Sequence, residues 1–183
     1  MEVVPLALEV RVEVVLSLSP HAGGTTEIVA SALAQGRGGS LVLLRDYRIH
    51  PCSGCGRCAQ AQCPWDDDAQ DLFAAVQAAP SLVLVAPVYF YHLPAPAKAW
   101  VDRAQSLYWR GRPQEIRPAA AVLLAGRRQG EELFSGIVRT LRFFLPYLGF
   151  ALGPVVELRG LESPDDVGAK VHDAVAGRLA AWP

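Results

Sequence analysis

The chain has 183 residues, 51% of them hydrophobic, and a formal net charge of −1. This length fits one domain with a sizeable core, and the near-neutral charge excludes the basic surface that nucleic-acid-binding domains need. No apolar run reaches the ~20 residues that cross a bilayer. Met1–Arg11 has no basic stretch ahead of an apolar one. We therefore expect no signal peptide, a cytoplasmic protein, and neither nucleic-acid nor membrane partners.

Short apolar runs alternate with longer amphipathic segments along the whole chain. Strands are expected at Val10–Leu18, Ser40–Leu44, Ser81–Ala86, Ala119–Ala125 and Pro154–Leu158. Helices are expected at Thr26–Gln35, at about Pro94–Tyr108, at Glu131–Leu148, and after both Asp66–Asp68 and Ser163. Gly36 is expected to close the first of these helices, and Asp66–Asp68 to act as the N-cap of the second helix along the chain. Pro146 is expected to end or kink the helix in which it lies. This alternation predicts a single parallel α/β domain over residues 1–183.

Ligands of parallel sheets bind beyond the carboxyl ends of the strands. The segments expected at that edge are Ser17–Thr26, Pro87–His92 and Gly126–Gly130. The segment after the first strand matches neither G-x-G-x-x-G nor G-x-x-x-x-G-K-[ST], which argues against the usual dinucleotide and Walker sites.

The first of these loops places hydroxyl groups around two glycines. Ser19, Thr25 and Thr26 surround Gly23–Gly24 immediately before a predicted helix. Hydroxyls, backbone N–H groups and the positive end of a helix form a cradle for one phosphate. The absence of lysine favours a terminal monophosphate over a triphosphate. The alternative, that these side chains only cap the helix, stays open.

The second loop is rich in aromatic residues. Tyr89, Phe90 and Tyr91 follow Pro87 and Val88 at the end of a predicted strand. A planar ring stacked at this surface would explain them, and a core or dimer-interface cluster would explain them equally well.

Several segments, in order and at consistent spacings, carry a resemblance to a known family. They are Ser19–Thr26, Pro51–Cys58, Asp67–Gln70, Ala86–Phe90 and Ala97–Arg103. Together they resemble the flavodoxin-like NAD(P)H-dependent FMN reductase family, and the cysteine run resembles its iron–sulfur flavoprotein branch. The likeness extends from about Val12 to Tyr108. It implies a flavodoxin-like three-layer sandwich with a five-stranded parallel sheet of order 2-1-3-4-5, and a cysteine-rich loop, 50–66, inserted after the second strand.

The resemblance also implies where FMN binds. Its phosphate is expected at Ser19, His21, Thr25 and Thr26. Its isoalloxazine ring is expected against Pro87, Val88, Tyr89 and Phe90, with Gly126 in the third loop. The chain departs from the family pattern at Leu18, where glycine is usual, at Thr25, where asparagine is usual, and at Tyr91–His92, where small residues are usual. We expect Tyr91 and His92 to narrow access to the ring.

All four cysteines lie within twelve positions, at Cys52, Cys55, Cys58 and Cys63. In a reducing compartment such clusters favour metal or redox chemistry over structural disulfides. The spacing is compatible with a [4Fe–4S] cluster, and Gly54 and Gly56 would let the backbone turn around it. Structural zinc usually uses two C-x2-C pairs from separate segments and is less well matched. Free or paired thiols are the third interpretation, and the sequence does not decide among them.

The remaining candidates have weaker support. Arg127 and Arg128 could contact the 2′-phosphate of NADPH or simply face solvent. Asp102–Arg103 is interpreted as a helix-end or subunit ion pair. His50 could be a ligand or an ordinary loop residue. No arrangement for hydrolytic chemistry is present.

We therefore predict an FMN-dependent oxidoreductase and electron-transfer flavoprotein. It takes reducing equivalents from NAD(P)H or a protein donor and passes them to a small-molecule or redox-protein acceptor, with a [4Fe–4S] cluster as a candidate relay. The resemblance implies a homodimer or homotetramer. The alternative is a binding or assembly module that is stabilised by zinc or an iron–sulfur cluster and has a degenerate flavin site. Leu18 and Tyr91–His92 are the features that favour this alternative.

Overall fold

The computed structural model describes residues 12–183 and contains one parallel sheet. Its strands are β1 (Val14–Ser17), β2 (Ser40–Leu43), β3 (Leu82–Pro87), β4 (Arg117–Ala125) and β5 (Phe150–Arg159). Their order is β2-β1-β3-β4-β5, and every neighbouring pair is parallel. The sheet order predicted from the sequence is confirmed.

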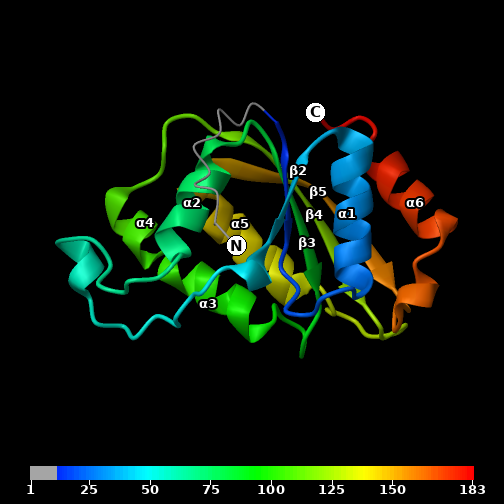
Figure 1. The fold of residues 1–183 in the computed structure, drawn as a ribbon, viewed down its shortest axis with the longest axis horizontal. Helices are drawn as coiled ribbons and strands as arrows, with labels where there is room; N and C mark the ends of the chain where they lie inside the picture. The colour runs from blue at the N-terminus through cyan, green and yellow to red at the C-terminus, as the bar shows by residue number, and fades with distance from the viewer. Residues whose placement is uncertain (1–11) are drawn as a thin grey trace, which may run out of the picture.

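Helices cover both faces of the sheet (Figure 1). On one face lie α1 (Thr25–Arg37) and α6 (Ala169–Leu179). On the other lie α2 (Ala69–Ala78), α3 (Ala95–Arg103), α4 (Gln105–Arg110) and α5 (Ser135–Leu148). The result is the three-layer sandwich that the sequence predicted. No helix within residues 12–183 is long and apolar enough to cross a membrane.

Each face of the sheet has its own hydrophobic core, because successive strand residues point to opposite sides. In β3, Leu82 and Leu84 belong to the cluster under α2, α3 and α5, whereas Val83 and Val85 belong to the cluster under α1 and α6. All four side chains are fully buried, as expected for the centre of a parallel sheet. The rigid sheet therefore fixes the positions of the loops at its carboxyl edge.

Two strand predictions were wrong at their ends. The first strand begins at Val14, and Val12 is exposed in a bend, while Val10 and Arg11 lie outside the described residues. The fifth strand begins at Phe150 rather than Pro154, and it pairs with β4 along its length. Pro154 fits within it because β5 is an edge strand and the register with β4 shifts there.

Several helix boundaries also differ from the prediction. Gly36 lies inside α1, and the helix ends at Arg37, where Gly38 caps it in left-handed backbone with a φ of 64°. Pro146 lies inside α5 and does not end the helix. The helix continues to Leu148 and is capped by Gly149. The helix predicted from Pro94 to Tyr108 is divided at Ala104 into α3 and α4.

The start of two further helices was also misplaced. The segment Glu131–Phe134 forms turns, so α5 begins only at Ser135. After Ser163 a short 3-10 turn, Pro164–Asp166, precedes α6.

Candidate functional site

A cavity of about 420 Å³ lies at the carboxyl edge of the sheet, between the loops that follow β1, β3, β4 and β5. Its volume is within the range of roughly 300–1,000 Å³ that small-molecule sites occupy. It is lined by Ser19, His21, Gly24, Thr25, Thr26, Pro87, Val88, Tyr89, Leu124, Gly126, Leu161, Glu162 and Pro164. Every residue predicted to bind FMN is among them except Phe90.

The N-terminus of α1 opens into this cavity without a side-chain cap. The first helix-internal backbone bond runs from the Ile28 N–H to the Gly24 carbonyl, so the N–H groups of Thr25 and Thr26 have no partner within the helix. The Ser19 hydroxyl accepts the His21 N–H at 3.1 Å, which folds the loop over the helix end. Capping alone therefore does not explain these hydroxyl residues, and the geometry matches a phosphate cradle.

An acidic residue in the first turn of α1 is neutralised. Glu27 accepts the Gly23 N–H at 2.6 Å and forms two hydrogen bonds of 2.9 Å with Arg45. The Arg45 guanidinium, helped by the Gly23 N–H, lowers the pKa of Glu27. Arg45 thus compensates the charge of Glu27, and an anion can approach the end of α1.

The loop after β3 is a tight turn in strained backbone. Tyr89 and His92 exchange backbone hydrogen bonds of 2.8 and 2.9 Å, and between them Phe90 and Tyr91 have φ values of 48° and 63°. Two adjacent left-handed non-glycine residues are uncommon and tend to occur at functional sites. The turn leaves Phe90 fully exposed and packs closely on α5, where a Cβ at Gly136 would meet the Tyr91 carbonyl oxygen at 2.8 Å.

A second cavity of about 240 Å³ adjoins the first and shares Val88 and Gly126 with it. Phe90, Tyr91 and Arg127 line it. The prediction that Tyr91 narrows the site agrees with this placement. The same prediction for His92 was wrong, because its ring contacts the Thr140 hydroxyl on α5 at 3.1 Å and lines neither cavity; burial lowers its pKa.

Leu18 stands where the family pattern has glycine, and its side chain packs in the core under α2, α3 and α5. It does not line the cavity, so it leaves the flavin site open.

The residues that sequence reasoning missed follow β5. Leu161, Glu162 and Pro164 complete the wall opposite the second loop, and the Leu161 N–H is bonded to the Ala125 carbonyl at 3.1 Å. A Cβ at Gly126 would lie 3.1 Å from Cγ of Glu162, so the small residue there leaves room for this wall. The usable signal was their place after the fifth strand, at the ligand-binding edge.

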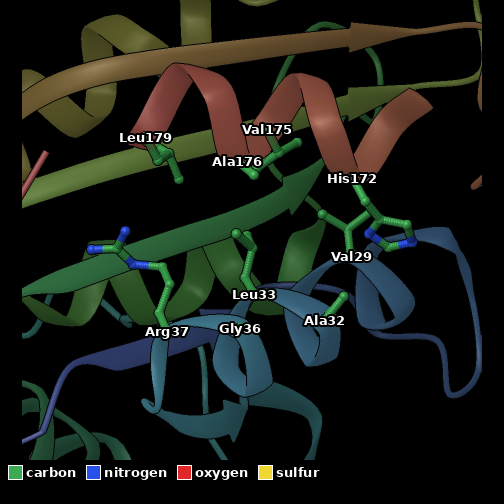
Figure 2. A pocket seen from close by; sticks show the side chains of 9 residues that line it. All are labelled: Val29, Ala32, Leu33, Gly36, Arg37, His172, Val175, Ala176 and Leu179. Carbon is green, nitrogen blue, oxygen red and sulfur yellow. The ribbon is translucent and has the colours of Figure 1, made fainter. Parts of the chain in front are cut away.

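A separate cavity of about 380 Å³ lies between α1 and α6 (Figure 2). Its walls are mostly aliphatic, and Arg37 and His172 lie at its two ends (Figure 2). None of the predicted site residues lines it. It is a gap in helix packing rather than part of the candidate site.

The cysteine loop projects beyond α2 and α4 (Figure 1). Its two ends, residues 48–50 and 65–68, are held together by hydrogen bonds and ring stacking, and we call this part of the loop the neck. Asp68 accepts the Arg48 N–H at 2.6 Å, and its own N–H is bonded to the Arg48 carbonyl at 3.0 Å. The His50 ring stacks on Trp65, with centroids 4.6 Å apart. No cysteine lines the candidate FMN cavity.

The neck is fastened to α3 by a buried ion pair. Arg103 binds both carboxylate oxygens of Asp67, at 2.5 and 3.0 Å, and the His50 carbonyl at 3.0 Å. Both charged side chains are fully buried. The interpretation of Asp102–Arg103 as one helix-end or subunit pair was therefore wrong: Asp102 pairs with Lys98 at the surface, and Arg103 turns inward. Burial raises the pKa of Asp67, but Arg103 and the N–H groups of His50 and Ala69 outweigh it, leaving it below its usual value.

This pair also changes the predicted role of the acidic run before α2. The side chains of Asp66–Asp68 were expected to cap the helix. Asp67 does accept the Ala69 N–H at 3.2 Å, but its main partner is Arg103, and Asp68 binds Arg48 instead. The run holds the neck of the cysteine loop more than it caps α2.

The four thiols are free, with Cys52 and Cys55 exposed and Cys58 and Cys63 half-buried. Within residues 12–183 no group of three or more His, Cys, Asp or Glu side chains is gathered as metal ligands. Gly54 and Gly56 adopt left-handed backbone, and the Gly54 N–H contacts the Cys52 sulfur at 3.5 Å. The Arg57 N–H and guanidinium lower the pKa of Cys55.

The residues present fit FMN, because an uncapped helix N-terminus, buried hydroxyls and the residues Pro87, Val88 and Tyr89 share one cavity. The donor set of the loop, four thiols with N–H groups beside them, also fits an iron–sulfur cluster or zinc. Because the thiols are not gathered, metal binding would have to close the loop.

Comparison with known proteins places the chain in a family. The family model for NADPH-dependent FMN reductase matches residues 13–147. An iron–sulfur flavoprotein from Methanosarcina thermophila is 33% identical over 121 residues, which cover 63% of each chain. One from Methanocaldococcus jannaschii is 29% identical over 136 residues, covering 72% of this chain and 69% of the relative. The chain therefore spans less than two thirds of the length of the first relative and slightly more than two thirds of the length of the second.

Solved structures share the fold. An NAD(P)H:quinone oxidoreductase from Methanothermobacter marburgensis superposes with a TM-score of 0.69 at 18% identity, covering 94% of this chain and 98% of the other. General stress protein 14 from Treponema denticola in complex with FMN gives 0.55 at 15% identity, covering 93% and 96%. At these identities only the fold is compared. With the family match over most of its length and iron–sulfur flavoproteins among its relatives, the chain belongs to the NADPH-dependent FMN reductase family.

Proposed function

We propose that the protein is an FMN-dependent oxidoreductase that takes reducing equivalents from NAD(P)H or a protein donor. The observation that carries this proposal is the cavity in which the uncapped N-terminus of α1 meets the wall formed by Val88 and Tyr89. A phosphate-binding end and an aromatic-binding end in one cavity match the shape and charge of FMN.

FMN, when bound, supplies hydride and single-electron transfer. The residues of the chain bind and orient it. The N–H groups and hydroxyls of Thr25 and Thr26 would hold the phosphate, with Ser19 beside them. Val88 and Tyr89 would fix the plane of the ring, and the small Gly126 leaves room for the wall at Glu162.

The smaller cavity is proposed as the place where the nicotinamide or the acceptor approaches. It adjoins the ring wall at Val88, and exposed aromatic side chains at Phe90 and Tyr91 border it. Arg127 also lines it and is proposed to contact the 2′-phosphate of NADPH. Arg128 packs instead near Gly160, where a Cβ would meet its side chain at 3.3 Å.

The four cysteines are proposed to hold a [4Fe–4S] cluster that exchanges electrons with a redox partner. The names of the curated relatives and the donor chemistry of the loop support this proposal. Because no cysteine lines the cavity of its own chain, we propose that electrons pass between chains of a homodimer or homotetramer.

The experiment starts from protein purified without oxygen. Its visible spectrum, flavin, iron and acid-labile sulfide are measured, and oxidation of NADPH and NADH is followed at 340 nm with FMN present. We expect one FMN per chain and faster oxidation of NADPH. Protein that neither contains FMN nor binds it when added would overturn the oxidoreductase. Bound FMN without iron or sulfide would overturn only the cluster.

A further inference from the structure

The side chain of Tyr91 reaches from the turn after β3 to the loop after β4. A Cβ at Gly130 would lie 3.2 Å from the Tyr91 hydroxyl oxygen and 3.9 Å from Nε of Arg127, so the tyrosine ends against the backbone of that loop. Tyr91 and Arg127 also line the cavity of about 240 Å³ in which the nicotinamide or the acceptor is proposed to approach. Tyr91 therefore spans one wall of this cavity from loop to loop.

The turn that carries Tyr91 is held against α5. A Cβ at Gly136 would lie 2.8 Å from the Tyr91 carbonyl oxygen, and the His92 ring contacts the Thr140 hydroxyl at 3.1 Å. Tyr91 has a φ of 63°, a left-handed conformation that residues other than glycine keep only where their surroundings hold them in it. These contacts fix the backbone from which the tyrosine ring extends.

The opposite end of the wall is held by β5. Nη1 of Arg159 donates a hydrogen bond of 3.0 Å to the Gly130 carbonyl, and the same guanidinium lies over the Phe134 ring, 4.9 Å from its centroid. Gly130 itself has a φ of 134°, which glycine adopts far more readily than any other residue. Because both ends of the wall are held, a ligand that pushed Tyr91 outward would have to break contacts in two loops.

The size and lining of the cavity limit what it can admit. Its volume of about 240 Å³ lies below the range of roughly 300–1,000 Å³ that small-molecule sites occupy. Val88, Phe90 and Leu133 give it apolar surface, and Arg127 gives it one cation. A planar compound with a single ring suits such a space. A second or third fused ring would extend into Tyr91 and the loop after β4.

We propose that Tyr91 is a specificity-determining residue that limits the small-molecule electron acceptor to planar compounds with a single ring and excludes fused-ring acceptors, free flavins among them. The inference rests on the proposed oxidoreductase function and deepens it by assigning the size class of the acceptor. With a quinone as acceptor, NAD(P)H supplies a hydride and solvent supplies a proton, so the quinone gains two electrons and two protons and leaves as the hydroquinone. This balance is the same for quinones of any size, so only access distinguishes them.

The test compares three substitutions in one turn. Tyr91→Gly removes the wall and places glycine in a left-handed conformation that it adopts freely, so this variant should fold. Tyr91→Phe keeps the ring and loses only the hydroxyl. Phe90→Gly is the matched control, because it makes the same change at the neighbouring left-handed residue, whose side chain is fully exposed to solvent.

Acceptor size is varied with duroquinone, which has one ring, and anthraquinone-2-sulfonate, which has three, each reduced anaerobically with NADPH. We expect Tyr91→Gly to raise kcat/KM at least about tenfold for anthraquinone-2-sulfonate and less than about twofold for duroquinone, because a steric block acts only on the larger substrate. Tyr91→Phe should match the wild type with both quinones, and Phe90→Gly should change both by the same factor. Equal changes for the two quinones in Tyr91→Gly, or a selective gain for anthraquinone-2-sulfonate in Phe90→Gly, would overturn the proposal.

A binding titration without an electron donor separates access from chemistry. Anthraquinone-2-sulfonate is added to oxidised, FMN-loaded protein, and the change in the flavin absorption spectrum gives its Kd. We expect Tyr91→Gly to bind it about tenfold more tightly than the wild type. Protein that does not bind FMN overturns the proposed function. FMN-loaded protein with the same Kd in wild type and Tyr91→Gly overturns this inference alone.

Discussion

The FMN cavity and the cysteine loop are two candidate cofactor regions built in different ways. The cavity is formed by four short loops, each beginning at the end of a strand in a rigid sheet, and its side chains already face one another. The cysteine loop is one long excursion that Asp67, Arg103 and the pairing of Arg48 with Asp68 hold at its neck, and its short 3-10 turn at Arg57–Ala59 lies against α4. Its four thiols are not gathered.

The difference shows how each region can bind its cofactor. In the cavity the backbone is set by the sheet, so the ligand meets a preformed site and the ordering cost is small. In the loop the anchors are preformed but the ligands are not, so binding and ordering are coupled. Substitutions in the cavity should therefore change affinity, whereas substitutions at the neck should change stability and loop order first.

The largest effect is expected at the neck. Asp67→Asn leaves the Arg103 charge buried without its counter-charge, and we expect a loss of about 3–5 kcal/mol in the free energy of unfolding at neutral pH. Urea denaturation followed by circular dichroism measures it. Asp71→Asn, an exposed aspartate in the first turn of α2, is the control. A loss below about 1 kcal/mol would show that the neck does not hold the fold.

The same pair predicts a pH dependence. The pKa of Asp67 is lower in the folded protein than in the unfolded chain, so its contribution is fully present above the unfolded value of about 4 and is lost as pH falls through the folded value. The stability difference between wild type and Asp67→Asn should be constant above about pH 5 and shrink below about pH 4. A difference that stays constant down to pH 2 would contradict this assignment.

The next effect is expected at the phosphate end of the cavity. Thr25→Glu places a carboxylate at the start of α1, where the FMN phosphate is proposed to bind. Losing one charge-assisted contact of roughly 1.5–3 kcal/mol and adding repulsion predicts on the order of 100-fold weaker FMN binding. Fluorescence titration measures it. Riboflavin, which lacks the phosphate, is the matched control ligand and should lose much less; equal losses for both would mean that the phosphate binds elsewhere.

A smaller effect is expected on the opposite wall. Gly126→Val adds a side chain whose Cβ would lie 3.1 Å from Cγ of Glu162. Crowding of about 1–3 kcal/mol predicts roughly tenfold weaker binding of both FMN and riboflavin. Gly168→Val is the control, because a Cβ there meets nothing within 4 Å. Unchanged flavin affinity in Gly126→Val would place the flavin outside this cavity.

The smallest effect is expected at Glu162. Glu162 lines the cavity and is exposed, so its negative charge would repel a bound phosphate. Glu162→Gln should strengthen FMN binding about two- to threefold at low salt, and the gain should fade as ionic strength rises. The control is Glu115→Gln, which lies before β4 at the far edge of the sheet. A gain that persists at high salt would point to a cause other than charge.

Much of this architecture was predictable because local patterns and the global fold agree. Apolar runs bounded by glycine and proline located β2, β3 and β4, and the residues at their ends lie together in one cavity. The errors fall where sequence patterns mislead. Pro154 was predicted to start the fifth strand, yet pairing with β4 extends β5 back to Phe150 across a register shift.

The candidate site was predictable to a similar extent. Ser19, Thr25 and Thr26 were identified by their place before a helix, which the sequence displays directly. Leu161 and Glu162 were not, because their role depends on where the chain passes after β5 rather than on their own chemistry.

The sequence alone determined the alternation of strands and helices and the clustering of the four cysteines, because these depend on local spacing and periodicity. The sheet order and the flavin-binding residues to be tested came from the resemblance to a family, which the order of its motifs carries. The tertiary structure decided what holds the cysteine loop. Arg103 and Asp67 are 36 residues apart, and each lies beside a more obvious partner or role in the sequence. Only the packing of α3 against the loop buries both charges, and a buried charge must find its counter-charge wherever the fold brings one within reach.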